Sequence, residues 1–153
     1  MSNKEKQRKL LQENLRSIRK IAGWTAECLG DKVGLSKQTI SNMENGKTQM
    51  TLTQYIAIRA VLDFEIALHP ENTVLPQVID ILVDKGSELE DENYTEVKET
   101  VNTVAASAST VKNGEQLEKM LKLLVSPGVI GALVALGVIL GDTSTVKKLN
   151  WLK

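Results

Sequence analysis

The chain has 153 residues, of which 42% are hydrophobic and 3% are aromatic, and its formal net charge is zero. This length and composition suit one ordinary domain or two small ones with a buried core. The lone Cys28 excludes an internal disulfide, and together with the lone His69 it gives neither a zinc site nor a catalytic dyad. We therefore expect no enzyme, no metal site and no cofactor.

The zero net charge conceals an uneven distribution along the chain. Residues 1–62 contain 11 Lys and Arg against 5 Asp and Glu, whereas residues 63–153 contain 8 against 14. Within the second part, residues 63–118 are strongly acidic and residues 119–153 are basic. The charge thus favours a polyanionic partner for the first part only.

The N-terminal segment, MSNKEKQRKLLQENL, is charged and has no apolar stretch of signal-peptide length. We therefore expect this end of the chain to stay in the cytoplasm. Its basic residues Lys4, Lys6, Arg8 and Lys9 are compatible either with an arm that touches a polyanion or with a solvated, frayed helix start.

The stretch over 25–44, TAECLGDKVGLSKQTISNME, predicts two short helices joined by a tight turn. Thr25 can cap the first helix, in which Leu29 and Val33 lie four apart on one face. Gly34 tolerates the positive φ that a sharp turn requires, and Leu35 fills the angle between the helices.

The second of these helices combines an apolar inner face with a polar outer face. Ser36 is a second N-cap, and Ile40 and Met43 form an inward stripe. In the major groove of DNA, Lys can bond guanine, and Gln or Asn can bond adenine through two hydrogen bonds. Two amphipathic helices of an ordinary bundle would show a similar polar face. The side chains left outside are Lys37, Gln38, Thr39, Ser41 and Asn42.

A resemblance decides between these alternatives. The run over 14–62 resembles the Xre/Cro/C1 family of helix-turn-helix DNA-binding domains at LRSIRKIAGWT, at LGDKVGLSKQTISNMENGK and at TLTQYIAIRAVL. The resemblance implies a lambda-repressor-like, mainly α-helical domain over residues 1–62, and double-stranded DNA as the partner.

The same resemblance implies roles for individual residues. Lys37, Gln38 and Asn42 would reach base edges, while Arg19 and Glu44 would form a partly buried ion pair between the first helix and the recognition helix. Ala26 departs from the family, in which many members carry a phosphate-contacting Gln. The residues implied at the DNA backbone are Thr25, Ser36, Thr39, Ser41, Asn45 and Lys47.

Residues 63–69 alternate between apolar and other side chains, which predicts a short, half-buried β-strand. With no second strand in the chain, Phe64, Ile66 and Leu68 would dimerise by antiparallel pairing with another copy. The segment resembles the dimerising strand of HipB-like and HigA-like antitoxins. The alternative is a continuation of the preceding helix into a fifth helix. Either arrangement predicts a homodimer with recognition helices about 34 Å apart, on an inverted repeat.

Residues 71–153 are expected to form a helical C-terminal region for oligomerisation or regulation. Apolar spacing predicts a short helix over 75–85, and the acidic run GSELEDENYTE favours a solvated linker over a calcium loop. A heptad-like seam then predicts a helix of about 20 residues, ending at Asn113 and Gly114, that packs against another subunit or against its own neighbours. The seam consists of Tyr94, Val97, Val101, Val104, Ala108 and Val111.

The segment 123–141 has 19 residues without a charge, at the lower limit for spanning a bilayer. Ser126, Pro127 and Gly128 are expected to break it and to leave a helix over 129–140. Such a helix suits either a buried oligomerisation or core element or a membrane-inserted or partner-covered one.

Taken together, these patterns predict a cytoplasmic, sequence-specific transcriptional regulator, a homodimeric repressor of the bacterial or phage type. Residues 63–70 would be its dimerising strand or connector. Two alternatives stay open: an antitoxin whose second half neutralises a protein partner, and a regulator tethered to the membrane through 123–141.

Overall fold

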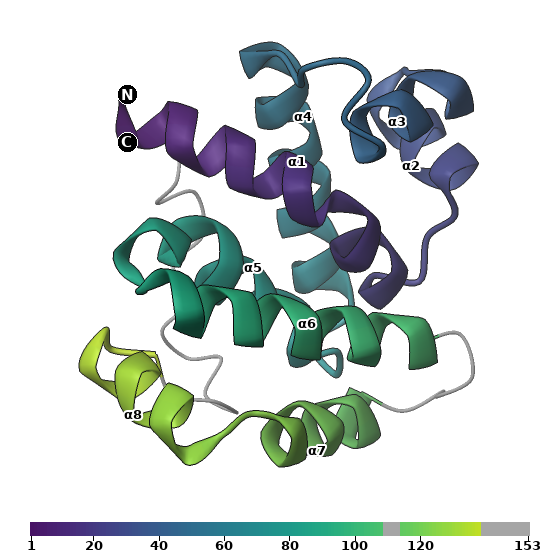
Figure 1. Ribbon diagram of the computed structural model, residues 1–153. Helices are drawn as coiled ribbons and strands as arrows, with labels where there is room; N and C mark the ends of the chain where they lie inside the picture. Colours follow the sequence, from purple (N-terminus) through teal and green to yellow (C-terminus); the bar gives the residue numbers. More distant parts are fainter. Residues whose placement is uncertain (109–113, 139–153) are drawn as a thin grey trace.

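The computed structural model describes residues 1–108 and 114–138, and this part of the chain is helical without any β-strand (Figure 1). Helix α1 runs through the middle of the described part, with α2 to α4 on one side and α6 on another. The elements are α1 (Asn3–Ile21), α2 (Ala26–Val33), α3 (Lys37–Glu44), α4 (Leu52–Leu68), α5 (Val74–Ile79), the π-helix η1 (Asp80–Asp84), the 3-10 helix η2 (Gly86–Glu88), α6 (Asp91–Ser107), α7 (Gly114–Leu124) and α8 (Pro127–Ala135).

The first four helices begin where side chains satisfy free backbone N–H groups. Ser2 and Thr51 each form a reciprocal capping box, with Glu5 at the start of α1 and with Gln54 at the start of α4. Ser2 and Glu5 therefore start α1 as a capped helix rather than a frayed one. The buried face of α1 contributes Leu11, Leu15 and Ile18 to the core, which they share with Ile40, Ile58 and others.

The predicted β-strand near 63–69 is wrong, because α4 continues through this segment to Leu68. No glycine or proline interrupts the helix before Pro70, and a helix pairs its own backbone groups, whereas a lone strand would leave them unpaired. The apolar residues at every second position, which predicted the strand, therefore lie in a helix. Phe64 and Leu68 lie four apart and are exposed, whereas Ile66 packs against the core.

The helix predicted over 75–85 is present as α5 followed by η1, and it occupies the centre of the C-terminal region. All residues of α5 are buried, including Pro76 and Gln77, and Ile81 to Val83 continue the apolar core. The Arg59 guanidinium of α4 reaches this helix, donating from its two Nη atoms to Asp84 over 2.7 and 3.1 Å. The C-terminal region is therefore bound to α4 as well as to α1.

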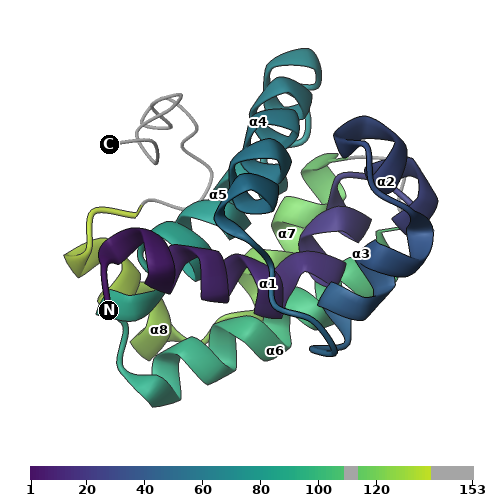
Figure 2. The same ribbon diagram turned by 90° about the horizontal axis from the view of Figure 1, so that it is seen from above.

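Helix α6 lies along α1 (Figures 1 and 2), and the described part of its apolar seam faces the interior of the same chain. Val97, Val101 and Val104 are fully buried there. The second part of the acidic run, 91–96, forms the first turns of α6 instead of a linker. This helix ends at Ser107, and the end expected at Asn113 lies outside the described residues.

The apolar segment 123–141 is divided between the end of α7, a bend, and α8. The break falls at Ser126, which caps α8, with Pro127 as the first helical residue. Helix α8 ends at Ala135, short of the expected residue 140, and 139–141 lie outside the described part. Within residues 1–108 and 114–138, no helix is both long enough and apolar enough to cross a membrane.

Candidate nucleic-acid interface

The turn between α2 and α3 has the local geometry that its sequence predicts. The Thr25 hydroxyl accepts a hydrogen bond from the Cys28 N–H (3.0 Å), and Ser36 accepts one from the Thr39 N–H (3.0 Å). Between these caps, Gly34 adopts φ +72°, in the left-handed region that favours glycine. Each helix of the pair thus has a defined start, and the turn has a fixed direction.

A second glycine, Gly30, is equally important for this turn and was not identified from the sequence. It lies inside α2, and a Cβ there would overlap the carbonyl oxygen of Leu35. The Leu35 N–H in turn donates to the Gly30 carbonyl (2.8 Å), so the two backbones are in direct contact. The available signal was a glycine in the interior of a short helix, where it is otherwise unfavourable.

The outer face of α3 carries the polar residues that the sequence places at DNA bases. Ile40 and Met43 are buried, whereas Lys37 and Gln38 are exposed and Asn42 is half-buried. The Gln38 Nε2 donates to the Asn42 Oδ1 over 2.9 Å, one helical turn away. The two amides therefore form one ordered pair, which still offers a donor and an acceptor to a partner.

The residues expected at the DNA backbone lie around α3 rather than on one patch. Thr25 and Ser36 stand at the exposed N-termini of α2 and α3, and Asn45 and Lys47 are exposed in the loop that follows α3. Thr39 and Ser41 are half-buried on the flanks of α3. Helix N-termini carry free N–H groups and a partial positive charge, which suits phosphate.

Helix α3 is attached to α1 by a buried ion pair between Arg19 and Glu44. The Arg19 Nε and Nη2 atoms donate to the two Glu44 oxygens over 2.7 and 2.9 Å, and its Nη1 donates to the Trp24 carbonyl (2.9 Å). Both side chains are largely buried, with Glu44 only 3% exposed. Arg16, which sequence reasoning did not select, adds a bond from its Nη2 to the Asn45 Oδ1 (2.6 Å).

The loop after α3 is held by Gln12, another residue without an obvious signal in the sequence. Its Nε2 donates to the carbonyls of Met43 (3.0 Å) and Thr48 (2.7 Å), and its Oε1 accepts from the Met50 N–H (2.8 Å). A single amide thus satisfies three backbone groups of the segment that leads from α3 to α4. This fixes the position of Lys47 relative to α1.

These features define a helix-turn-helix DNA-binding protein. Residues 15–68 match the family described as Helix-turn-helix. The chain is also 32% identical, over 63 residues, to the protein "Antitoxin HipB" of Escherichia coli (strain K12), across 41% of this chain and 72% of that protein. No solved structure matches.

The chain belongs to the Xre-type helix-turn-helix family of DNA-binding regulators. The family match ends where α4 ends, so α5 to α8 lie outside it.

Proposed function

We propose that this regulator is a sequence-specific, homodimeric repressor of an inverted-repeat operator. The observation that carries the proposal is the outer face of α3, where Lys37 lies beside the paired amides of Gln38 and Asn42. These side chains match the base edges of guanine and adenine in the major groove. Recognition helices in adjacent grooves over a promoter would block transcription sterically.

Affinity and specificity would come from different residues. The loop and helix N-termini around α3 would hold phosphates and supply most of the affinity, while Lys37, Gln38 and Asn42 would supply the sequence preference. The proposed backbone contacts are Thr25, Ser36, Thr39, Ser41, Asn45 and Lys47.

The proposal is tested by comparing two substitutions on operator and random DNA. Gln38→Ala is expected to relax preference at one base position, at a cost of about 1 to 3 kcal/mol of specific binding. Lys47→Ala is expected to weaken binding to all sequences alike and to reduce the salt slope by about 1. Equal losses on operator and random DNA for Gln38→Ala would reject base reading by this residue.

The homodimer is proposed to form through the outer face of α4, as a helix-to-helix contact. Leu52, Ile56, Phe64 and Leu68 are spaced in multiples of four and are exposed to between 39% and 65%. Ala60, which is also exposed, completes the stripe. Figure 2 shows that α4 projects beyond the other helices. A second copy is the natural occupant, because an inverted repeat requires two domains related by a two-fold axis.

The dimer is tested by light scattering of the full chain. Phe64→Asp places a charge at the most exposed apolar residue of the stripe and is expected to give a monomer, while Glu71→Ala, outside the stripe, is expected to leave the dimer intact. A wild-type chain that is monomeric over the whole concentration range would contradict this part of the proposal.

A second candidate, an antitoxin, is favoured by the name of the relative from Escherichia coli and by exposed apolar side chains beyond the family match. Leu123 and Val134 of α7 and α8 are 83% and 59% exposed, and they would form the surface for a toxin. Co-expression with the product of the neighbouring gene tests this candidate. Relief of growth arrest by the wild-type chain, but not by Leu123→Asp, would support it.

A further inference from the structure

The first turns of α1 extend the fold beyond the helix-turn-helix family. Helix α1 begins at Asn3, whereas the family match begins at residue 15. Between these points the chain carries the basic residues Lys4, Lys6, Arg8 and Lys9. The capping box of Ser2 and Glu5 orders this segment as a helix, which gives its positive charges fixed positions.

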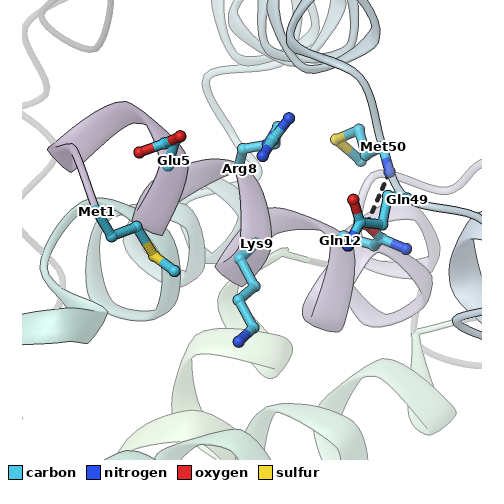
Figure 3. A pocket seen from close by; sticks show the side chains of 7 residues that line it. All are labelled: Met1, Glu5, Arg8, Lys9, Gln12, Gln49 and Met50. Atoms are coloured by element: carbon cyan, nitrogen blue, oxygen red, sulfur yellow. Dashed lines mark hydrogen bonds between the residues drawn. The ribbon is translucent and has the colours of Figure 1, made fainter.

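A groove of about 540 Å³ runs along this part of α1, opposite the segment that leads into α4 (Figure 3). Arg8, Lys9 and Gln12 line it from α1, and Gln49 and Met50 line it from the other side. In Figure 3 the Arg8 side chain extends on the same side of α1 as Met50, while Lys9 extends from the same turn in another direction. Arg8 and Lys9 thus both line the groove from α1, although their side chains diverge, and the Gln49 amide lines it from the segment before α4.

The position of Arg8 relative to the DNA-binding loop is set by Gln12. Gln12 is bonded to the loop at Met43, Thr48 and Met50, and Arg8 lies four residues, about 6 Å, earlier on the same helix. Gln49 on the opposite wall lies two residues from Lys47, which corresponds to at most about 7 Å of chain. The groove is thus the immediate neighbour of a proposed phosphate contact.

The cations of the groove are not neutralised by ion pairs. In residues 1–108 and 114–138, no carboxylate forms a salt bridge with Arg8 or Lys9, although seven other Lys and Arg residues of this part do form one. The acidic residue of the groove, Glu5, accepts a hydrogen bond from the Ser2 N–H (2.7 Å) at the helix start; the hydrogen bonds with Ser2 and, to a smaller extent, the charge of Arg8 lower the pKa of Glu5, although Arg8 and Glu5 form no salt bridge. Positive charge in a groove with hydrogen-bond donors is complementary to a phosphodiester.

We propose that this groove is an accessory site for the DNA sugar-phosphate backbone, in which Arg8 and Lys9 contact phosphates next to those held by the loop of Lys47. The site lies outside the helix-turn-helix motif and lengthens the contact with the duplex by the first turns of α1. The inference rests on the proposed DNA binding, and it concerns affinity and not sequence preference, since a phosphate is the same at every base pair.

The test is the salt dependence of binding to a random-sequence 30-base-pair duplex, so no operator is needed. The full chain is compared with the double variant Arg8→Ala, Lys9→Ala and with the control Lys119→Ala on α7, which also removes an exposed positive charge. Each lost phosphate contact lowers the slope of log K against log salt by about 0.9. We expect the double variant to lower it by nearly 2 and the control to leave it unchanged.

Two further measurements distinguish the loss of phosphate contacts from a general loss of folded protein. Arg8→Lys, Lys9→Arg keeps both charges and is expected to restore the wild-type slope, and circular dichroism is expected to show equal helix content in all variants. A double variant with the slope of the wild type, in a wild-type chain that binds DNA, would overturn the accessory site alone. A wild-type chain that binds no DNA would overturn both this site and the proposed function.

Discussion

The two regions of the molecule differ in what determines their helices. In residues 2–68, Ser2, Thr25, Ser36 and Thr51 each cap the helix that follows, and Gly34 ends α2. In the C-terminal region, α6 begins without a side-chain cap, and α5, whose first turn has one long hydrogen bond from the Leu75 N–H to the Asn72 Oδ1 (3.3 Å), is buried on all sides. Local chemistry therefore specifies the first region, whereas packing against α1 and α4 specifies much of the second.

Helix α1 connects the two regions through different faces. Gln12, Arg16 and Arg19 bond to α3 and its loop, whereas Asn14 and Ser17 bond to Tyr94 and Asn102 of α6. Because the same helix positions the recognition helix and the C-terminal region, the contrast between the regions can be tested by changing contacts on each face.

The largest effect is expected for Glu44→Ala, which removes one partner of the buried pair in the first region. Arg19 would keep its charge in a site with little access to water, and the free energy of unfolding is expected to fall by about 3 to 5 kcal/mol. The measurement is urea unfolding at neutral pH. Glu27→Ala on the exposed first turn of α2 is the control and is expected to cost less than about 1 kcal/mol. Similar losses for both variants would show that the pair is not essential to the fold.

The next largest loss of stability is expected for Gly30→Ala, and it should exceed the loss for Gly34→Ala. Gly30→Ala must displace the Leu35 backbone, at a cost of about 1 to 3 kcal/mol. Gly34→Ala meets no atom within 4 Å and carries only the strain of its positive φ, about 1 to 2 kcal/mol. Thermal unfolding is expected to show the lower Tm for Gly30→Ala. The opposite order would mean that α2 can shift away from α3 without loss.

The difference between local chemistry and tertiary packing also explains which features could be predicted from the sequence. The helices of 25–44, their caps and the inward positions of Ile40 and Met43 follow from neighbouring residues, and the structure has them. Gln12 and Gly30 were missed because their roles depend on contacts with Thr48 and Leu35 that spacing does not reveal. The roles of individual residues at DNA bases and phosphates stay predictions.

The error over 63–69 has a related origin. A pattern of only seven residues cannot distinguish a strand from the last two turns of a helix. Here Phe64 and Leu68 are apolar but exposed, so they do not mark the buried face of the helix. Helix α8 ends at Ala135, earlier than the predicted residue 140, whereas the end predicted for α6 at Asn113 lies outside the described residues. The break at Ser126 and Pro127, which rests on local chemistry, was predicted correctly.

A smaller effect is expected at the contact between the regions, for Tyr94→Phe. The Tyr94 hydroxyl accepts from the Asn14 Nδ2 (2.9 Å) and donates to the Glu13 Oε2 (3.1 Å), and burial raises the pKa of Tyr94 to about 12. Its loss leaves a buried Asn14 amide with one partner fewer, at a cost of about 1 to 2 kcal/mol. Thr95→Ala, on the exposed side of α6, is the control for urea unfolding. A neutral Tyr94→Phe would mean that the Tyr94 hydroxyl does not contribute to joining the two regions.

The smallest effect is expected at His69, which caps the end of α4 at the junction of the regions. The hydrogen bond with Glu71 (2.9 Å), and then the charge of Glu65, raise the pKa of His69 above its usual 6.5. The folded state therefore binds the proton more tightly than the unfolded chain, and the resulting stabilisation is fully present below the unfolded pKa and is lost as pH rises through the folded pKa. Tm is expected to fall slightly as pH increases from 6 through the raised pKa, and His69→Gln is expected to remove that slope. Because the imidazole is exposed, salt should weaken the effect. If His69→Gln left the dependence of Tm on pH unchanged, that dependence would arise from other groups. A Tm that rises with pH in this range would contradict the ion pair itself.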